Sequence, residues 1–591
     1  MEQNLQLKNS IILVSIDVRE ASDAAWWPSI LSSLHHLQCP QNLYSLTKNY
    51  FSNRVAILHL NNYKTEKTVT KGCPQGSCCA PGLWNINLEY SRHTKVIAFA
   101  DDIAIMTQGN TPTEAEAYVN SDLAKIEKWA RENKLIFNDT KSKAMLITRR
   151  KKIENINVYL NNRRLTTVED MKYLGIIFDS RLTFDKHIEN VVEKSTILIQ
   201  MLARAAKLQW GLGHKSLKTI YEGALIPMIT YGAPVWEQAI KKQKNLKKLQ
   251  RVQRLMNIKT AKAYKTISFE ASCVMAGVPP IGITIEEKAL LYKAKQNGGR
   301  YGHECDLPLP VVEWPHLACK VKIREINNST TYSIDIFTDG SKCEDKIGAG
   351  VVIYVDGTLA KTCKFKLAQH CSNNQAEAIA ILKSLEQLSS FSDHISNDKT
   401  AAIHTDSKVT LASLKNNSTH TPIIEQIRNK IRQLMDHNWT IHFGWVKAHI
   451  GIEGNEIADK IAKEAAEDDQ LPIIYNKTPL TTVITNQKNI TLTKWQRQWE
   501  NTLKGATCKS FFPTIEQRLK LKIPVTPEFT AIVTGHGKTK SYYHRFKIAE
   551  DPMCPCNLGE QTSDHLIYEC RILQDQRRIM KQQIAASGGT W

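Results

Sequence analysis

The sequence predicts a multidomain α/β protein, on three observations. Its 591 residues are several times the length of a small domain, so we expect three or four folded units. Strand-like apolar runs alternate with helical stretches over about residues 11–178, and a mainly helical pattern continues to about residue 295. A compact β-β-β-α-β-α-β-α pattern then occupies residues 333–466. The intervening segment, 297–332, is rich in Gly, Pro and Asn, and we interpret it as a linker.

The charge of the chain favours a polyanionic partner. Lys and Arg outnumber Asp and Glu by 78 to 58, which gives a formal net charge of +20. Such an excess is typical of proteins that bind nucleic acid, although many basic proteins bind nothing acidic. Composition therefore leaves both interpretations open, and the motifs must decide between them.

The sequence contains no pattern typical of secretion or membrane insertion. Its 14 cysteines form no dense framework, and no signal-peptide pattern precedes residues 11–14. The longest weakly polar stretch, residues 223–236, is interrupted by Pro227 and Pro234 and is shorter than the about 20 residues that span a bilayer. We expect a nuclear or cytoplasmic protein without a membrane anchor.

Several carboxylates stand where predicted strands end or predicted helices begin. They are Asp339, Glu377, Asp406 and Asp459. Ser372 can cap the helix whose first turn holds Glu377, and Asn455 is expected to cap the helix whose second turn holds Asp459. Any one of these carboxylates could simply be solvated or cap a helix, so their meaning depends on the sequences around them.

The strings FTDGS, NNQAE, HTDS and AHIGIEGNEIAD contain these acids, in this order and on these elements. In this combination, residues 333–466 strongly resemble the ribonuclease H family. The resemblance implies a mixed five-stranded sheet with helices, in which Asp339, Glu377, Asp406 and Asp459 bind two Mg²⁺ (or Mn²⁺) ions. Two such cations about 4 Å apart stabilise the attacking and leaving oxygens of a cleaved phosphodiester.

The same resemblance implies a role for His449, which precedes Asp459 by ten residues. At this position the family carries a mobile histidine that transfers a proton or assists product release. The alternative is a loop histidine with no part in the chemistry. We expect His449 to support catalysis.

A second set of carboxylates lies near the N-terminus. An apolar strand over residues 11–16 ends at Asp17, and another over residues 96–100 ends at Asp101 and Asp102. Adjacent aspartates are weak evidence, because such pairs are common in turns. The string GCPQGS, between the two strands, makes a second two-metal site the better interpretation.

The strings SIDVREASDAAWW, GCPQGSCCAPGLWNI, FADDIAI and YLGIIFD occur in the order found in reverse transcriptases. The chain resembles those of non-LTR retrotransposons, most closely the jockey-like and type-1 elements of arthropods. This resemblance implies a right-hand polymerase palm over residues 1–180 and a helical, basic thumb over residues 181–296. It assigns Asp17 and Asp101 to metal binding, with Asp102 in support, and assigns template and nucleotide contacts to Gln75, Gly76 and Lys141.

Departures from the family pattern predict an incomplete reverse transcriptase. Only about ten residues precede the strand that ends at Asp17, so the fingers strands and the endonuclease portion of a full-length element are expected to be missing. Ser22 stands where the family has an aromatic gate against ribonucleotides, and the interval from Gly76 to Asp101 is short. We expect poor primer extension by this chain alone, because phosphoryl transfer requires an aligned triphosphate.

A strongly basic helix is predicted at the end of the thumb. Residues 241–265 contain ten Lys or Arg and no acid, and Leu246, Leu249, Val252 and Met256 fall on one helical face. Such a helix could follow the phosphate backbone of a hybrid, or it could simply present a solvated charged face. Its uniform sign favours hybrid binding.

The C-terminal region is predicted as a helical connector over residues 467–524 and a small tail over residues 525–591. The tail contains the pattern C-x-C-x₈-H-x₄-C, formed by Cys554, Cys556, His565 and Cys570. These residues could hold one structural Zn²⁺, although C-x₂-C is the commoner spacing and unliganded thiols remain the alternative. Tyr542, Tyr543 and Arg545 could either stack on bases or fill a small core.

Taken together, these motifs predict a ribonuclease H that hydrolyses the RNA strand of RNA–DNA hybrids within a retrotransposon-derived polyprotein. Its partners would be the hybrid, an RNA template and DNA. The alternative is a catalytically inactive nucleic-acid-binding protein derived from a retroelement. The complete set of acids argues against that alternative, because binding alone gives no chemical reason to keep them.

Overall fold

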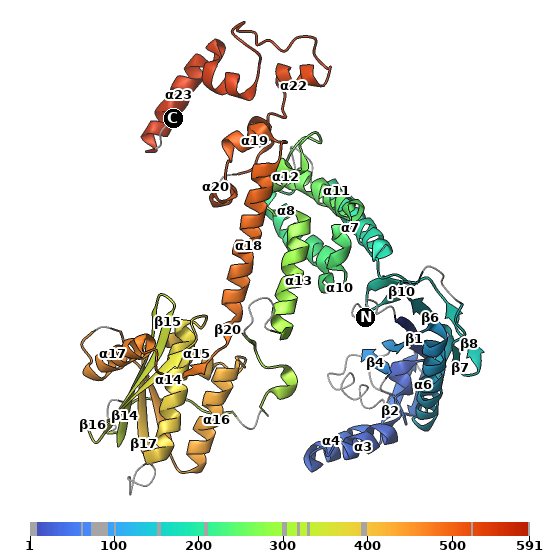
Figure 1. Ribbon diagram of the computed structural model, residues 1–591, viewed down its shortest axis with the longest axis vertical. Coiled ribbons are helices and arrows are strands. Elements are labelled where there is room, and N and C mark those ends of the chain that lie inside the picture. The colour runs from blue at the N-terminus through green and yellow to red at the C-terminus, as the bar shows by residue number, and fades with distance from the viewer. Residues whose placement is uncertain are drawn as a thin grey trace. The chain divides into compact units, whose positions relative to one another are not determined.

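A computed structural model of the protein describes residues 9–60, 63–72, 93–99, 102–150, 155–205, 211–297, 304–315, 320–327, 331–391, 399–448, 450–521 and 524–588 (Figure 1). The chain divides into two compact units, Met1–Lys259 and Thr260–Trp591. Each unit has its own sheet, so we describe each by itself.

The first unit is built on a five-stranded sheet with the order β4-β5-β1-β6-β9. These strands are β1 (Ser10–Val18), β4 (Thr94–Phe99), β5 (Asp102–Gly109), β6 (Phe137–Ile147) and β9 (Thr166–Thr167). Because side chains alternate along a strand, Ile12 and Val14 of β1 pack towards Leu123 of helix α6 (Pro112–Glu132). Ile11 packs with Met145 in the core on the opposite face. The apolar run that predicted this strand therefore reflects burial on both faces.

Short helices and hairpins surround this sheet. They are α2 (Ala21–Ala24), α3 (Trp27–His36), α4 (Gln41–Phe51), and the hairpins β2–β3 (Val55–Leu60, Tyr63–Thr68), β7–β8 (Tyr159–Leu160, Arg163–Arg164) and β10–β11 (Asp170–Tyr173, Ile176–Asp179). Helix α7 (Asp185–Ala205) packs on the last hairpin, where the Ile177 N–H donates to His187 Nδ1 at 3.4 Å. Burial lowers the pKa of His187 to about 4, so this ring is neutral at neutral pH.

The remainder of the first unit is helical, as the sequence predicted. The elements are α8 (His214–Ile220), a π-helical turn (Tyr221–Leu225), α9 (Ile226–Thr230), α10 (Ala233–Trp236), a 3₁₀ turn (Glu237–Lys241) and α11 (Gln243–Thr260). Leu249, Val252 and Met256 of α11 are buried, which confirms the predicted apolar face of this helix.

The second unit contains a mixed sheet with the order β13-β18-β17-β14-β15-β16-β19. Its strands are β13 (Arg324–Glu325), β14 (Ile334–Cys343), β15 (Lys346–Val355), β16 (Thr358–Leu367), β17 (Thr400–Thr405), β18 (Thr440–Trp445) and β19 (Ile473–Tyr475). The antiparallel β14–β15–β16 meander and the parallel β14–β17–β18 strands confirm the predicted mixed sheet. The predicted count of five strands was wrong, because β13 and β19 are too short to leave a periodic pattern.

Helices cover both faces of this sheet (Figure 1). They are α14 (Asn373–Leu388), α15 (Lys408–Lys415), α16 (Pro422–Asp436) and α17 (Glu453–Glu467). Ser372 caps α14 as predicted, in a reciprocal capping box with Gln375. The predicted cap at Asn455 was wrong, because the N–H of Asn455 already bonds the carbonyl of Ile452, which places Asn455 inside the first turn of α17.

Two glycines of β15 allow α17 to lie directly on the sheet. A Cβ at Gly348 would overlap the Ala462 carbonyl and the Ala466 nitrogen, and one at Gly350 would overlap the Ala458 carbonyl. Helix backbone therefore occupies the space that side chains would need.

Replacing Gly350 with alanine should destabilise the packing of α17 on the sheet. The added methyl group meets backbone that cannot rotate away. We therefore expect the free energy of opening of β15, measured by native-state hydrogen exchange, to fall by about 1–3 kcal/mol. Gly213→Ala, where nothing lies within 4 Å of the new Cβ, is the matched control. Equal exchange in the two variants would show that α17 is not held by this close approach.

The predicted linker, residues 297–332, is partly docked on the second sheet. Strand β12 (Cys305–Asp306) pairs in parallel with β20 (Thr478–Pro479), and β13 pairs with the edge of β18. Between them, the Trp314 ring stacks on His420 with ring centroids 4.0 Å apart. These described parts of the segment are bound to the domain rather than suspended between domains.

The C-terminal helices pack with the last helices of the predicted thumb. The set comprises α12 (Phe269–Ala276), α13 (Ile281–Asn297), α18 (Leu480–Asn501), α19 (Ala506–Phe511), α20 (Ile515–Lys520), α21 (Pro527–Thr534) and α22 (Lys540–Arg545). The last helix, α23 (Gln574–Ala586), lies near the end of the tail. Lys494 Nζ pairs with Glu286 at 2.5 Å, and buried Arg518 donates to the Met275 carbonyl at 2.6 Å. The boundary between the two units therefore falls inside the predicted 181–296 thumb. In the described part of the chain, no helix is long and apolar enough to cross a membrane.

Candidate functional site

The first carboxylates of the C-terminal site meet where β14 approaches the start of α14. Asp339 lies on β14 and is 7% exposed, and Gly340 follows it. A Cβ at Gly340 would overlap the backbone nitrogen of Glu377, so the glycine permits the strand and the helix to touch here. Glu377 is the fifth residue of α14, slightly beyond its predicted first turn.

The other two carboxylates arrive on neighbouring elements. Asp406 follows β17, which runs parallel to β14 and pairs Thr405 with Thr338. Asp459 lies on α17, which the glycines of β15 bring onto the same part of the sheet. Charge interactions link Asp339 with Asp406 and Asp459, and Glu377 with Asp406, although no three of these carboxylates have oxygen atoms that all lie within 4.8 Å of one another.

Electrostatics indicate that these carboxylates interact. Burial, with the neighbouring charges of Asp406 and Asp459, raises the pKa of Asp339 to about 7. Burial and Asp406 also raise the pKa of Glu377, although hydrogen bonds from Ser407 and Asn373 oppose that shift. Crowded carboxylates of this kind bind protons or hard cations in preference to standing ionised alone. Four oxygen-donor groups fit Mg²⁺ or Mn²⁺ by ligand type.

Several residues that the sequence did not single out support these acids. Asn373 Nδ2 donates to Glu377 Oε1 at 2.9 Å, and the Trp445 indole N–H donates to the Asp406 backbone carbonyl at 3.1 Å. Lys463 Nζ lies 2.6 Å from Asp459 Oδ2. The i,i+4 spacing could have revealed Lys463, whereas the Trp445 hydrogen bond leaves no sequence signal. His449 lies outside the described residues.

The N-terminal acids lie in register on adjacent antiparallel strands. Asp17 of β1 is directly opposite Asp102 of β5. The Tyr173 hydroxyl of β10 donates to the Asp102 carbonyl at 3.2 Å and to the Ile97 carbonyl at 3.1 Å, so the YLGIIFD segment holds the hairpin that carries Asp102. Burial and the charge of Asp102 raise the pKa of Tyr173.

Lys141 lies on the strand on the other side of β1. Asp17 pairs with Asn138 and Ser15 pairs with Lys143, so β6 bulges between these pairs and carries exposed Lys141 in the bulge. Three other predicted site residues, Gln75, Gly76 and Asp101, lie outside the described residues.

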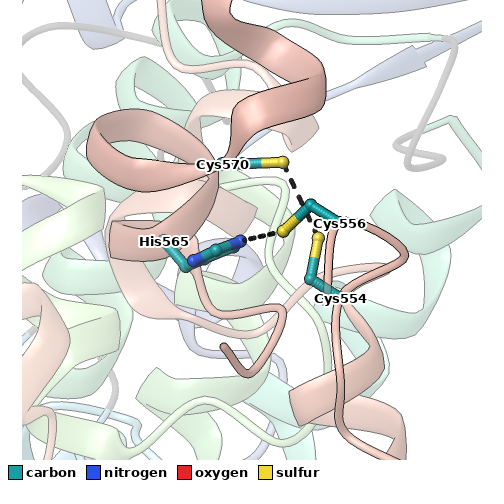
Figure 2. A group of neighbouring side chains, drawn as sticks. All are labelled: Cys554, Cys556, His565 and Cys570. Carbon is teal, nitrogen blue, oxygen red and sulfur yellow. Dashed lines mark hydrogen bonds between the residues drawn. The ribbon is translucent and has the colours of Figure 1, made fainter. Parts of the chain in front are cut away.

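The tail brings its cysteines and histidine into one cluster. Ligand atoms of Cys554, Cys556, His565 and Cys570 all lie within 4.8 Å of one another. The four side chains point towards a common centre, with Cys556 Sγ 3.1 Å from His565 Nε2 and Cys554 Sγ 3.7 Å from Cys570 Sγ (Figure 2). Among the described residues, this is the one set of three or more metal-ligating groups drawn so closely together.

Local backbone geometry positions this cluster. Met553 and Glu560 form an isolated bridge that closes the turn bearing the first two cysteines, and a single π-helical turn (His565–Glu569) separates His565 from Cys570. Glu569 lies 3.4 Å from His565 Nδ1, on the side of the ring opposite Cys556, and so helps to orient Nε2 towards the cluster.

The thiols of the cluster are polarised unequally. Burial raises the pKa of Cys554. For Cys556, desolvation is outweighed by hydrogen bonds from the Leu558 backbone, Cys554 and His565, which lower its pKa to about 6. A thiolate beside an imidazole nitrogen and two further thiols is a donor set that suits Zn²⁺.

Tyr542 is the buried aromatic residue of the Tyr542–Tyr543 pair in the tail. Its hydroxyl lies 2.8 Å from Thr266 Oγ1, which also lies 2.8 Å from His536 Nδ1. Arg545 lies over the Tyr542 and Phe546 rings. Of the two alternatives that the sequence left open for Tyr542, the structure therefore favours the small core.

The basic helix α11 has one paired and one open side. Lys242 pairs with Asp185 at 3.1 Å, and Lys248 pairs with Glu189 at 2.6 Å. Exposed Lys244 also acts electrostatically on Asp185 and Glu189. Lys247 and Arg251 are exposed and lie one turn apart, along one side of the helix.

Comparison with known proteins matches both predicted enzyme domains. The reverse transcriptase (RNA-dependent DNA polymerase) family model matches residues 1–178, and the RNase H family model matches residues 331–467. Among solved structures, LC11-RNase H1 in complex with an RNA/DNA hybrid is 24% identical, with 22% of this chain and 96% of that chain covered and a TM-score of 0.20.

Curated relatives come from arthropod mobile elements. A 115 kDa protein in type-1 retrotransposable element R1DM of Drosophila melanogaster is 28% identical, over 48% of this chain and 28% of the relative. A Pol polyprotein from type-1 element R1 2 of Nasonia vitripennis is 28% identical over 38% and 58%, respectively. The RNA-directed DNA polymerase from mobile element jockey of Drosophila melanogaster is 27% identical over 39% and 26%. The chain thus spans less than two thirds of each relative. It carries a reverse transcriptase domain followed by a ribonuclease H domain and is a homologue of the Pol polyproteins of R1 and jockey non-LTR retrotransposons of arthropods.

Proposed function

We propose that this chain hydrolyses the RNA strand of RNA–DNA hybrids by two-metal catalysis. The observation that carries the proposal is the electrostatic interaction of buried Asp339 with Asp406 and Asp459, beside Glu377 at the start of α14. A non-catalytic binding surface would gain nothing from carboxylates that repel one another and the phosphates of the substrate.

The proposed roles of the individual residues are as follows. Asp339, Glu377, Asp406 and Asp459 would hold two Mg²⁺ (or Mn²⁺) ions, which supply charge stabilisation at the attacking and leaving oxygens. Asn373 would orient Glu377 through the bond to its carboxylate, and the Trp445 indole would fix the backbone at Asp406. His449 is proposed to move a proton or assist product release, on the family resemblance.

The test is cleavage of a hybrid whose RNA strand is labelled, by the purified 591-residue chain, with and without Mg²⁺. We expect Mg²⁺-dependent cuts in the RNA of the hybrid and none in the same RNA alone. Tight binding without cleavage would instead favour a catalytically inactive nucleic-acid-binding protein.

The reverse transcriptase domain is proposed to carry a second metal site, with Asp17, Asp101 and Asp102 as its acids. The pairing of Asp17 with Asp102 across β1 and β5 supports this proposal. Nucleotide contacts by Gln75, Gly76 and Lys141 remain predictions from the resemblance. For the tail, we propose one structural Zn²⁺ held by the Cys/His cluster, because its donor set and spacing suit that ion.

Helix α11 is proposed to bind the phosphates of the hybrid. Neutralising Lys247 and Arg251 to glutamine should flatten the salt dependence of hybrid binding, with a reduction of about 0.9 in the log–log slope for each phosphate that the helix no longer neutralises. Binding is measured without divalent cations, so that cleavage cannot interfere. The control is Lys242→Gln with Lys248→Gln, whose charges already pair with acids. An unchanged slope in the Lys247→Gln, Arg251→Gln variant would show that the charged side of α11 is only solvated.

A further inference from the structure

Residues that lie outside the ribonuclease H sequence pattern hold the start of α14 through hydrogen bonds. Gln375 is 7% exposed, and both ends of its side-chain amide are used. Its Oε1 accepts from the Ser372 N–H at 2.9 Å, and its Nε2 donates to Asp306 Oδ2 at 2.8 Å and to the Lys477 carbonyl at 3.3 Å. The cap of this helix is therefore bonded to segments 69 and 102 residues away in the chain.

Those two segments are themselves joined to each other. Cys305 and Asp306 pair with Thr478 and Pro479 in the β12–β20 ladder, and the Thr478 N–H donates to the Glu304 carbonyl at 2.9 Å. We call this pair of segments, residues 304–306 and 475–479, the flank clamp. It is a built structure against the cap of α14 rather than a loose crossing of two loops.

Further hydrogen bonds tie the clamp to the same end of the helix. Buried Cys371, just before the cap, donates through Sγ to the carbonyls of Tyr475 at 3.7 Å and Lys477 at 3.6 Å. Burial and the charge of Asp306 raise the pKa of the Tyr475 phenol. The Asp306 carboxylate also lies by the N-terminus of α14, where a negative charge is favourable.

The first two turns of α14 carry the groups that matter for cleavage. Glu377 lies two residues beyond Gln375, and Asn373, which bonds the Glu377 carboxylate, lies two residues before it. A rigid helix transmits a shift of its cap to both residues. Metal ligands must be held within about 0.5 Å of their working geometry, so a loose cap would weaken metal binding before it unfolds the domain.

We propose that Asp306 is a positioning residue of the ribonuclease H site, acting through Gln375 on Glu377. This inference rests on the proposed function. It makes Asp306, which lies outside the matched segment 331–467, part of the metal-binding architecture.

The test uses the full chain and amide hydrogen exchange of residues 376–379, measured over a range of Mg²⁺ concentrations. In the wild-type chain, Mg²⁺ should slow this exchange as the site fills. In Asp306→Ala, the Mg²⁺ concentration for half-protection should rise about 10-fold, the usual size of such an effect. The Mg²⁺ midpoint of hybrid cleavage should shift in parallel, while KM for the hybrid changes little.

Two further variants separate positioning from general damage. Asp306→Asn keeps an oxygen acceptor for Gln375 and should restore the wild-type midpoint. Glu304→Ala is the matched control in the same segment, because Glu304 is 78% exposed and pairs with Lys477 at 3.2 Å. It should leave the midpoint unchanged.

The possible results of this experiment are distinct. Equal midpoints in Asp306→Ala and the wild-type chain, or no Mg²⁺ protection of α14 in either, would overturn the inference, as would equal shifts in Asp306→Ala and Glu304→Ala. If the midpoint shifts in Asp306→Ala but the wild-type chain never cleaves the hybrid, the positioning role is supported and the proposed function is rejected.

Discussion

Asp406→Asn should abolish hybrid cleavage while leaving hybrid affinity nearly unchanged. The substitution keeps the volume of the side chain and removes a charge at the end of β17 that we propose binds metal. Because this charge is proposed both to bind and to position the metal, its removal should lower the rate by at least about 1000-fold, equivalent to about 4 kcal/mol of transition-state stabilisation. Single-turnover cleavage with saturating enzyme gives this rate directly.

A surface aspartate provides the control for this change. Asp436 ends α16, is exposed, and is not among the acids of the site. Asp436→Asn should cleave at the wild-type rate. Cleavage by Asp406→Asn within a few-fold of that rate would remove Asp406 from the catalytic set.

Removing zinc from the tail should unfold the segment around the Cys/His cluster and leave hybrid cleavage largely intact. Structural zinc contributes about 10–16 kcal/mol of apparent binding energy in small domains, far more than the few buried side chains here could replace. Proteolysis of residues 553–570 should therefore accelerate sharply after chelation or in Cys570→Ser. Cleavage should change by less than about twofold, because the acids of the ribonuclease H site lie on strands and helices that share a hydrophobic core of their own.

The metal content of the protein checks the same assignment. Protein purified under reducing conditions should carry about one zinc per chain, as a single cluster of four ligands requires. Cys39→Ser, a partly exposed cysteine outside the cluster, should keep it. A zinc-free protein with a protease-resistant tail would end the proposal.

The sequence predicted the parts of the fold that local pattern determines. The long apolar strands β1 and β14, the capping box of α14 and the apolar face of α11 all follow from spacing within one element. The four acids proposed for the ribonuclease H site could also be selected from sequence, because each stands in a distinctive short string. Their electrostatic interaction could be expected only through the family resemblance.

The features that the sequence did not predict depend on hydrogen bonds and packing between distant segments. Strands of two or three residues, such as β13 and β19, have no period to detect. The bonds from Gln375 to Asp306 and from Trp445 to Asp406 join residues that no local rule connects. Gly348 and Gly350 looked like ordinary strand residues, and only the packed helix explains why a side chain is excluded there.

The two short strands at the ends of the second sheet have a practical consequence for anyone who isolates this domain. A fragment cut at residues 333 and 466 would lose both β13 and β19, and with them the partners of the outer edges of β18 and β16. Bare strand edges recruit other chains through their open backbone groups. Such a fragment should self-associate at high concentration, whereas one that begins near residue 304 and ends near residue 479 should stay monomeric.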